Sequence, residues 1–214
     1  MSFQEILASA APGKETVVTV GVFDGVHQGH RHLLRQVVDA AGGRYIPTVV
    51  TFSNRPITVL NPGTQPSYLT TVEQRVDLIK QQGIDLVVCL EFTLELAEVT
   101  AAEFAELLAA SLKMKGLILG PDSALGKDRK GDLEFMKKQG DQLGFWARSV
   151  EPLEVEGQLV KSRRIREAVA NGNMAACPEL LGRNHHLSGK VVVGDQRGRT
   201  LGFPTANVEV DDQL

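Results

Sequence analysis

The segment "VTVGVFDGVHQGHRHLLRQVV", residues 18–38, determines the predicted fold. It joins an apolar, strand-like run to a helical pattern through the turn "GVFDGVHQGH", and it contains three of the chain's five histidines. A strand, a glycine-rich turn and a helix in this order are typical of an open parallel sheet, in which ligands bind beyond the carboxyl ends of the strands. The first turn of such a helix carries unpaired N–H groups and a partial positive charge. We therefore expect an anion site at this turn.

Two histidines of this turn are the strongest candidates for phosphate binding. His27 and His30 are three residues apart, so they lie on the same side of the first helical turn and form a donor pair for phosphate oxygens. Gly21 and Gly25 allow the backbone to approach a ligand without an intervening Cβ. We expect His32 to lie off that side and to coat the helix. The alternatives are surface or capping histidines, and a metal site, which would be one or two ligands short.

The rest of the chain alternates short apolar runs with helical patterns. Such alternation predicts an α/β fold with one parallel sheet and helices on both of its faces. Thr70 with Glu73, and Thr100 with Glu103, form two capping-box patterns that open helices. The predicted strands are residues 16–22, 47–52, 85–92, 116–120 and 145–152.

The pattern changes after residue 185. The segment "LSGKVVVGDQRGRTLGFPTANVEV", residues 187–210, has two extended runs and no helical period, which predicts two antiparallel strands. Two strands alone are only marginally stable, so this segment either packs on the first domain or belongs to a longer protein. We predict a first domain at residues 1–185 and an incomplete β-rich module at residues 186–214.

Composition limits the classes of partner. A formal net charge of −3 argues against a nucleic-acid or membrane-surface partner, whereas the basic islands "GKDRKG" and "VKSRRIRE" indicate a small anionic ligand. The two cysteines have no partner at metal-ligand spacing, which predicts a reduced, cytoplasmic protein. Neither a signal-peptide pattern nor an apolar run of about 18 residues is visible. The sequence leaves the oligomeric state open.

The turn also carries a family resemblance. "GVFDGVHQGH" resembles the nucleotide-binding motif of the adenylyltransferase superfamily, and its Phe-Asp-Gly form resembles the bacterial bifunctional riboflavin kinase/FAD synthetase family. The resemblance extends over nearly the whole chain and implies a Rossmann-like nucleotidyltransferase domain. The other matching segments are "TVVTFSNRP", "YLTTVEQRVDLIKQQGIDLVVCLEF", "EFAELL", "GPDSALGKDRKGD", "VKSRRIREAVANGNMAACPELLGR" and, for the opening of the riboflavin kinase module, "GKVVVGDQRGRTLGFPTANVEV".

The resemblance implies adenylyl transfer from ATP to FMN, which gives FAD and pyrophosphate. Mg²⁺ would enter with ATP, and no metal would be held by protein side chains alone. Such a displacement requires no protein nucleophile, only positioning of two anions and neutralisation of the developing charge. The alternatives are adenylyl transfer to another small phosphate acceptor, and a non-catalytic nucleotide- or flavin-binding protein.

The same resemblance implies the site residues. The catalytic residues of this chain would be His27, His30, Ser162 and Arg166, and Arg166 would bind the pyrophosphate as a clamp. Other readings remain open: Asp24 as a turn-forming residue, Ser162 as a helix cap, Arg166 as part of a solvated face, and Asp122, Lys127 and Arg129 as loop residues. The residues implied to contact ATP are Gly21, Phe23, Asp24, Gly25, Gly29, Asp122 and Arg129.

The chain departs from the family pattern in three places. Ser123 and Leu125 stand where the family typically has aromatic residues, which weakens stacking on an isoalloxazine ring. Ser162 lies within "KSRR" instead of a run of small hydroxyl residues. Thr205 and Asn207 match residues that contact Mg²⁺ and ATP in the kinase module, but the chain ends before the family's catalytic glutamate. We therefore expect no riboflavin kinase activity, and formation of FMN from riboflavin and MgATP would overturn that expectation.

Overall fold

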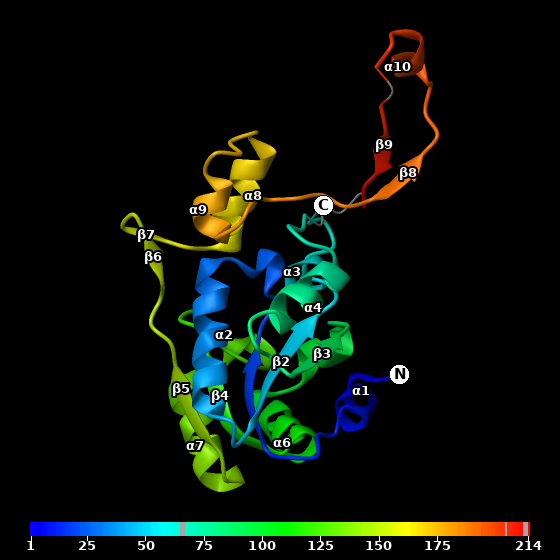
Figure 1. Cartoon of the computed structure of the whole chain (residues 1–214). Helices are drawn as coiled ribbons and strands as arrows, with labels where there is room; N and C mark the ends of the chain where they lie inside the picture. Colours follow the sequence, from blue (N-terminus) through cyan, green and yellow to red (C-terminus); the bar gives the residue numbers. More distant parts are fainter. Residues whose placement is uncertain (65–66, 204, 212–213) are drawn as a thin grey trace.

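A five-stranded parallel sheet forms the centre of the protein. The computed structural model describes residues 1–64, 67–203, 205–211 and 214 (Figure 1). The strand order is β3-β2-β1-β4-β5, and every neighbouring pair is parallel. The predicted α/β fold is therefore confirmed. The strands are β1 (Thr16–Val20), β2 (Ile46–Phe52), β3 (Leu86–Leu90), β4 (Met114–Leu119) and β5 (Trp146–Ser149).

Helices cover both faces of this sheet. Helices α2 (Gln28–Ala41) and α4 (Val72–Lys80) pack on one face, in a core with Val17, Val49 and Ile118. The other face packs against a second core that includes Val18, Val50 and Leu117. Successive strand residues thus point into opposite cores, which explains why these strands are apolar without strict alternation. The second core is covered by α1 (Phe3–Ser9), α6 (Ala101–Leu112) and α7 (Leu133–Leu143).

The helix caps confirm one predicted capping box and correct the other. The Thr100–Glu103 box opens α6 as predicted. At α4 the box is shifted by one residue, because Thr71 caps the helix and pairs with Gln74. The Thr70 hydroxyl instead accepts the N–H of Gly25 at 3.3 Å, so it holds the histidine-bearing turn.

A small helical unit packs beside the carboxyl edge of the sheet. Helices α8 (Ser162–Ala170) and α9 (Cys177–Leu181) bury Ile165, Cys177 and Leu181 against Leu69. The hairpin of β6 (Glu154–Val155) and β7 (Gln158–Leu159) joins β5 to this unit. The remaining short elements are η1 (Asp24–Val26), α3 (Pro56–Leu60), α5 (Leu94–Glu98) and η2 (Lys127–Arg129).

The C-terminal segment extends away from the sheet. Strand β8 (Lys190–Val192) pairs antiparallel with β9 (Asn207–Glu209), which confirms the two predicted strands (Figure 1). The short helix α10 (Arg197–Thr200) between them was not predicted from the sequence. Leu201 and Phe203 of this segment are exposed. The domain division at residue 185 stays a prediction.

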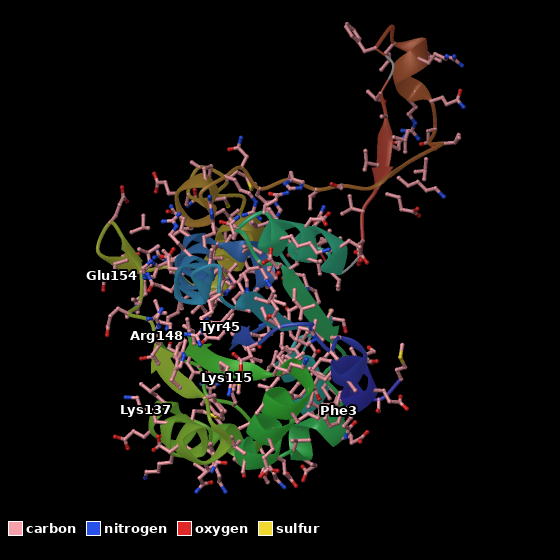
Figure 2. The ribbon with its side chains drawn as sticks, turned by 60° about the horizontal axis from the view of Figure 1, so that its bottom comes forward. Phe3, Tyr45, Lys115, Lys137, Arg148 and Glu154 are labelled. Carbon is pink, nitrogen blue, oxygen red and sulfur yellow. The ribbon has the colours of Figure 1, made fainter. Side chains whose placement is uncertain are left out.

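The edge strand β5 is fastened to α2 by a side chain. Arg148 donates from Nη2 to the carbonyl oxygen of Gln36 on α2 at 3.1 Å. Figure 2 shows Arg148 at the yellow-green edge strand β5. Its guanidinium also lies 5.4 Å from the ring centroid of Trp146. Gly116 on β4 leaves the space that the Trp146 ring occupies. The Trp146 ring of β5 therefore packs over the backbone of β4, and Arg148 links β5 to α2.

Within the described residues, no helix combines the length and the apolar character that crossing a membrane requires.

Gly140 lies inside α7, where an alanine would normally favour the helix. A Cβ at this position would overlap the carbonyl oxygen of Phe145, which is backbone and cannot turn away. We therefore expect Gly140→Ala to lower the free energy of unfolding by about 1–3 kcal/mol, measured by urea denaturation. Gly13→Ala is the matched control, because nothing lies within 4 Å of its Cβ position. Equal stability of the two variants would contradict this packing.

Candidate functional site

Two cavities open at the carboxyl edge of the sheet. The histidine cavity, about 360 Å³, is lined by residues that follow β1, β4 and β5, by the start of α2 and by residues 159–162. The phenylalanine cavity, about 660 Å³, is lined by the ends of β1, β2 and β3 and by residues 122–129. Gly21, Asp122 and Ser123 line both cavities. They meet where the strand order reverses between β1 and β4, which is where α/β sheets bind ligands.

The turn after β1 has an unusual backbone. Phe23, Gly25 and Val26 all have positive φ angles, of 54°, 78° and 38°. At Gly25 a Cβ would lie 2.7 Å from Leu69 Cδ1, so both conformation and packing require glycine. A positive φ is strained for a β-branched residue such as Val26. Such strain persists only where the surrounding structure enforces it.

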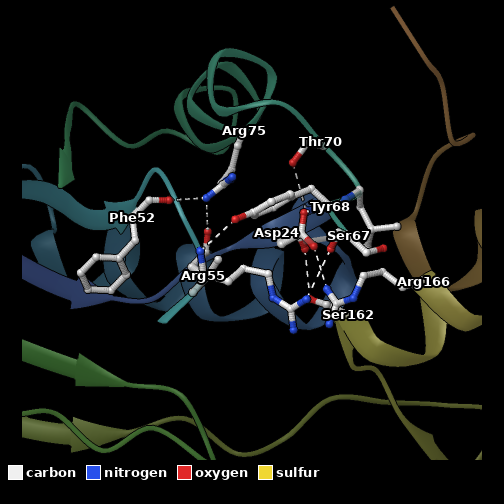
Figure 3. Close-up of polar contacts among 12 residues, drawn as sticks. Asp24, Phe52, Arg55, Ser67, Tyr68, Thr70, Arg75, Ser162 and Arg166 are labelled. Carbon is white, nitrogen blue, oxygen red and sulfur yellow. Dashed lines mark hydrogen bonds and ion pairs between the residues drawn. The ribbon is translucent and has the colours of Figure 1, made fainter. Parts of the chain in front are cut away.

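Asp24 enforces this turn through three contacts. Its carboxylate is buried, accepts the N–H of Leu69 at Oδ1 (2.8 Å) and forms an ion pair at Oδ2 with Arg166 Nη1 (2.7 Å) (Figure 3). Its carbonyl oxygen accepts a hydrogen bond from Ser162 Oγ at 3.1 Å. Asp24 therefore joins the turn to the segment before α4 and to α8, as one of the two sequence interpretations proposed.

Two further arginines stabilise the same region, and sequence reasoning missed both. Arg183 donates to the carbonyl oxygen of Gly25 at 2.8 Å, which fastens the end of α9 to the turn. Arg75 is 1% exposed and donates from Nη1 to the carbonyl oxygens of Val22 (3.1 Å) and Phe52 (2.5 Å). Burial lowers the pKa of the Arg75 guanidinium. Arg75 thus fixes the two chain segments that leave β1 and β2 and enter the cavities.

His27 and His30 form a stacked pair at the start of α2. Their ring centroids are 3.6 Å apart, and His27 Nδ1 accepts the backbone N–H of His30 at 3.2 Å. Burial, followed by the charge of Arg166, lowers the pKa of His27 to about 4. Burial and the neighbouring His27 hold the pKa of His30 well below its usual value. Both rings are therefore neutral at pH 7, and the proton of His27 lies on Nε2, available to donate.

The structure brings most of the predicted residues together. Ser162 is the first residue of α8, preceded by Lys161 at the cap position, so Ser162 is not the helix cap. His32 lines the histidine cavity instead of merely coating the helix, which corrects the sequence interpretation. The predicted residues that line the histidine cavity are Gly21, Phe23, His27, Gly29, His30, Asp122 and Ser162.

Other predicted residues lie elsewhere. Arg129 lines the phenylalanine cavity and donates to the carbonyl oxygen of Asp122 at 2.5 Å. Asp24, Gly25 and Arg166 form the support of the turn described above and line neither cavity. Thr205 and Asn207 belong to the C-terminal segment, and both are exposed.

The phenylalanine cavity contains the aromatic rings that the loop lacks. Phe52 and Phe92 meet edge to face, with ring centroids 5.7 Å apart and an interplanar angle of 88°. Phe104 also lines this cavity, together with Ser123 and Leu125. The rings come from the ends of β2 and β3 and from α6, whereas sequence reasoning looked for them only in the loop. The cavity therefore offers flat apolar surface to a ring system.

The fold and this site define a doubly wound α/β protein, with neutral donors at a helix N-terminus beside an apolar cavity. Comparison with known families agrees. The family model for FAD synthetase matches residues 10–164, and the model for riboflavin kinase matches residues 181–214. The chain therefore belongs to the FAD synthetase family.

Curated relatives support this membership. The bifunctional riboflavin kinase/FMN adenylyltransferase of Escherichia coli (strain K12) is 36% identical over 96% of this chain and 66% of its own length. The Pseudomonas fluorescens protein of the same name is 35% identical over 91% of this chain and 63% of its own length. The chain thus spans just under two thirds of these relatives.

A solved structure has the same fold. It is described as a macrolide-efflux protein from Streptococcus pneumoniae and is 32% identical to this chain, with a TM-score of 0.85. The match covers 94% of this chain and 66% of that one.

The lowered histidine pKa values predict how stability depends on pH. The pKa of His27 is about 4 in the folded chain and 6.5 for an unperturbed histidine, so the unfolded chain binds more protons between these values. The contribution of the neutral, buried His27 to the free energy of unfolding should be complete above pH 6.5. Below that pH the free energy of unfolding should fall, and the part due to His27 is up to about 1.4 kcal/mol per pH unit.

Urea denaturation between pH 4.5 and 7.5 measures this dependence. His27→Gln removes one titrating group, so its stability should fall less steeply with decreasing pH than that of the wild type. Parallel profiles for the two proteins would show that His27 is not buried in its neutral form.

Proposed function

We propose that this chain transfers AMP from MgATP to the phosphate of FMN, giving FAD and pyrophosphate. The observation that carries the proposal is the pair of cavities that share Gly21, Asp122 and Ser123 at the switch point of the sheet. A transfer between two bound substrates requires two adjacent sites with a common wall, where the reacting groups meet. Membership of the FAD synthetase family supports the same reaction.

The chemistry of the linings supports one substrate in each cavity. The histidine cavity has the start of α2 and the neutral donors His27 and His30, which suit the phosphates of ATP. The phenylalanine cavity has Phe52, Phe92 and Phe104, which suit the isoalloxazine ring of FMN. The flavin phosphate would then reach the common wall from one side and the α-phosphate of ATP from the other.

The reaction requires no covalent intermediate with the protein. An oxygen of the FMN phosphate attacks the α-phosphorus, the bond from that phosphorus to the bridging oxygen of the β-phosphate breaks, and pyrophosphate leaves. N–H groups of His27 and His30 donate to phosphate oxygens and disperse the negative charge of the transition state. Mg²⁺ enters as part of MgATP. Among the described residues, no group of three or more His, Cys, Asp or Glu side chains is placed to hold a metal ion.

FAD formation from MgATP and FMN, followed by chromatography with a parallel pyrophosphate assay, tests the proposal. We expect FAD from the wild type and a loss of at least about 100-fold in rate for His30→Ala, because a donor to the reacting phosphates is removed. His186→Ala is the matched control, since His186 is exposed and lies outside both cavity linings, and it should keep the wild-type rate.

Other outcomes would select the alternatives. Pyrophosphate release with a different small phosphate, but none with FMN, would indicate another acceptor for the adenylyl group. Binding of ATP without turnover of any phosphate acceptor would exclude both enzymatic functions.

A further inference from the structure

An ion pair crosses the histidine cavity. Lys161 Nζ lies 2.7 Å from Asp122 Oδ2. Asp122 follows β4, whereas Lys161 immediately precedes α8, and both side chains line the cavity. The pair therefore links two walls that belong to separate parts of the fold.

Lys161 is also the one lysine or arginine among the described residues that line the histidine cavity. The other side chains with a full charge in this lining are Asp122 and Glu151, and both are acidic. His27 and His30 are neutral at pH 7, because burial lowers their pKa values. A polyphosphate bound here would therefore meet a single fixed positive charge, and that charge is already paired.

The arginine that the family resemblance implies for this task is engaged elsewhere. Arg166 forms its ion pair with the buried Asp24 and does not line the cavity. The two arginines that follow Ser162 are outside the lining as well: Arg163 pairs with Glu167, and Arg164 donates to the carbonyl oxygen of Leu159. Lys161 is thus the cation of this segment that faces the cavity.

The ammonium of Lys161 can exchange its partner, the Asp122 carboxylate, for another anion. Its side chains are 52% and 76% exposed, and an exposed ion pair contributes only about 0–1 kcal/mol to stability. The lysine has a flexible four-carbon stem, whereas its backbone is held at the start of α8, with its carbonyl oxygen accepting the N–H of Arg164. The ammonium can therefore leave Asp122 for a stronger anion while its attachment point stays in place.

We propose that Lys161 is the residue that neutralises the polyphosphate of ATP, and that Asp122 holds its ammonium across the cavity until the nucleotide replaces the carboxylate. This rests on the proposed function only in identifying the ligand as a nucleoside triphosphate. Hydroxyl side chains at this position could donate hydrogen bonds to a phosphate but carry no charge, whereas lysine adds a positive charge.

Calorimetric titration of the full chain with MgATP, MgADP and AMP tests the proposal. Lys161→Met should weaken MgATP binding about 10-fold or more, because a charge-assisted hydrogen bond to the polyphosphate is lost, and should leave AMP binding within about 2-fold. Asp122→Asn should tighten MgATP binding, since it removes the competing carboxylate from the cavity. Arg163→Met is the matched control and should bind all three nucleotides like the wild type, because the Arg163 side chain is 84% exposed, pairs with Glu167 and is not part of the cavity lining.

Two results would overturn the proposal. One is an equal effect of Lys161→Met on MgATP and AMP, or no effect on either. The other is weaker MgATP binding in Asp122→Asn, with no further loss when Lys161→Met is added to it, because the pair would then act only as a structural link.

A parallel FAD assay separates this proposal from the proposed function. If the wild type makes no FAD but Lys161→Met selectively loses MgATP, the reaction assignment fails and the role of Lys161 stands. If the wild type makes FAD and Lys161→Met binds and reacts normally, the role of Lys161 fails and the reaction stands. Absence of nucleotide binding by the wild type would overturn both.

Discussion

The buried carboxylate of Asp24 is the interaction on which the site depends. It joins the strained turn after β1 to Leu69 and to Arg166 on α8, and its two oxygens each have a partner. Removing one partner of a buried ion pair costs about 3–5 kcal/mol, because the other charge remains buried without compensation. The turn, the segment before α4 and the α8–α9 unit are therefore held as one arrangement. The His27–His30 pair starts directly after this turn.

This constraint explains why the two histidines can act as neutral donors. Both rings are packed at the start of α2 directly after the turn, and burial lowers their pKa values. A neutral imidazole with its proton on Nε2 donates a hydrogen bond to a phosphate but supplies no full positive charge. The positive charge in the described lining is instead carried by Lys161, whose side chain is half exposed. Donors are thus held rigidly, whereas the compensating cation remains movable.

The sequence predicted the parts of the structure that depend on local pattern. The strand, turn and helix around His27 and His30 follow from glycine spacing and apolar periodicity, and the structure confirms the parallel sheet that they imply. Long-range contacts could not be predicted in this way. In the sequence Arg75 looks like an ordinary charged residue of a helix surface, but in the fold it is buried and donates to the carbonyl oxygens that follow β1 and end β2.

The same limit applies to the aromatic residues and to the helix cap. Phe52 and Phe92 are far apart in sequence and meet only because β2 and β3 are neighbours in the sheet. Thr70 and Thr71 have equal capping chemistry, and the choice between them depends on the contact of Thr70 with Gly25.

Hydrogen exchange of α8 in Asp24→Asn, followed by mass spectrometry, tests the central role of Asp24 most directly. The account predicts that the amides of α8 exchange on the order of 100-fold faster than in the wild type or in the exposed control Arg163→Met. Unchanged exchange of α8 in Asp24→Asn would contradict it.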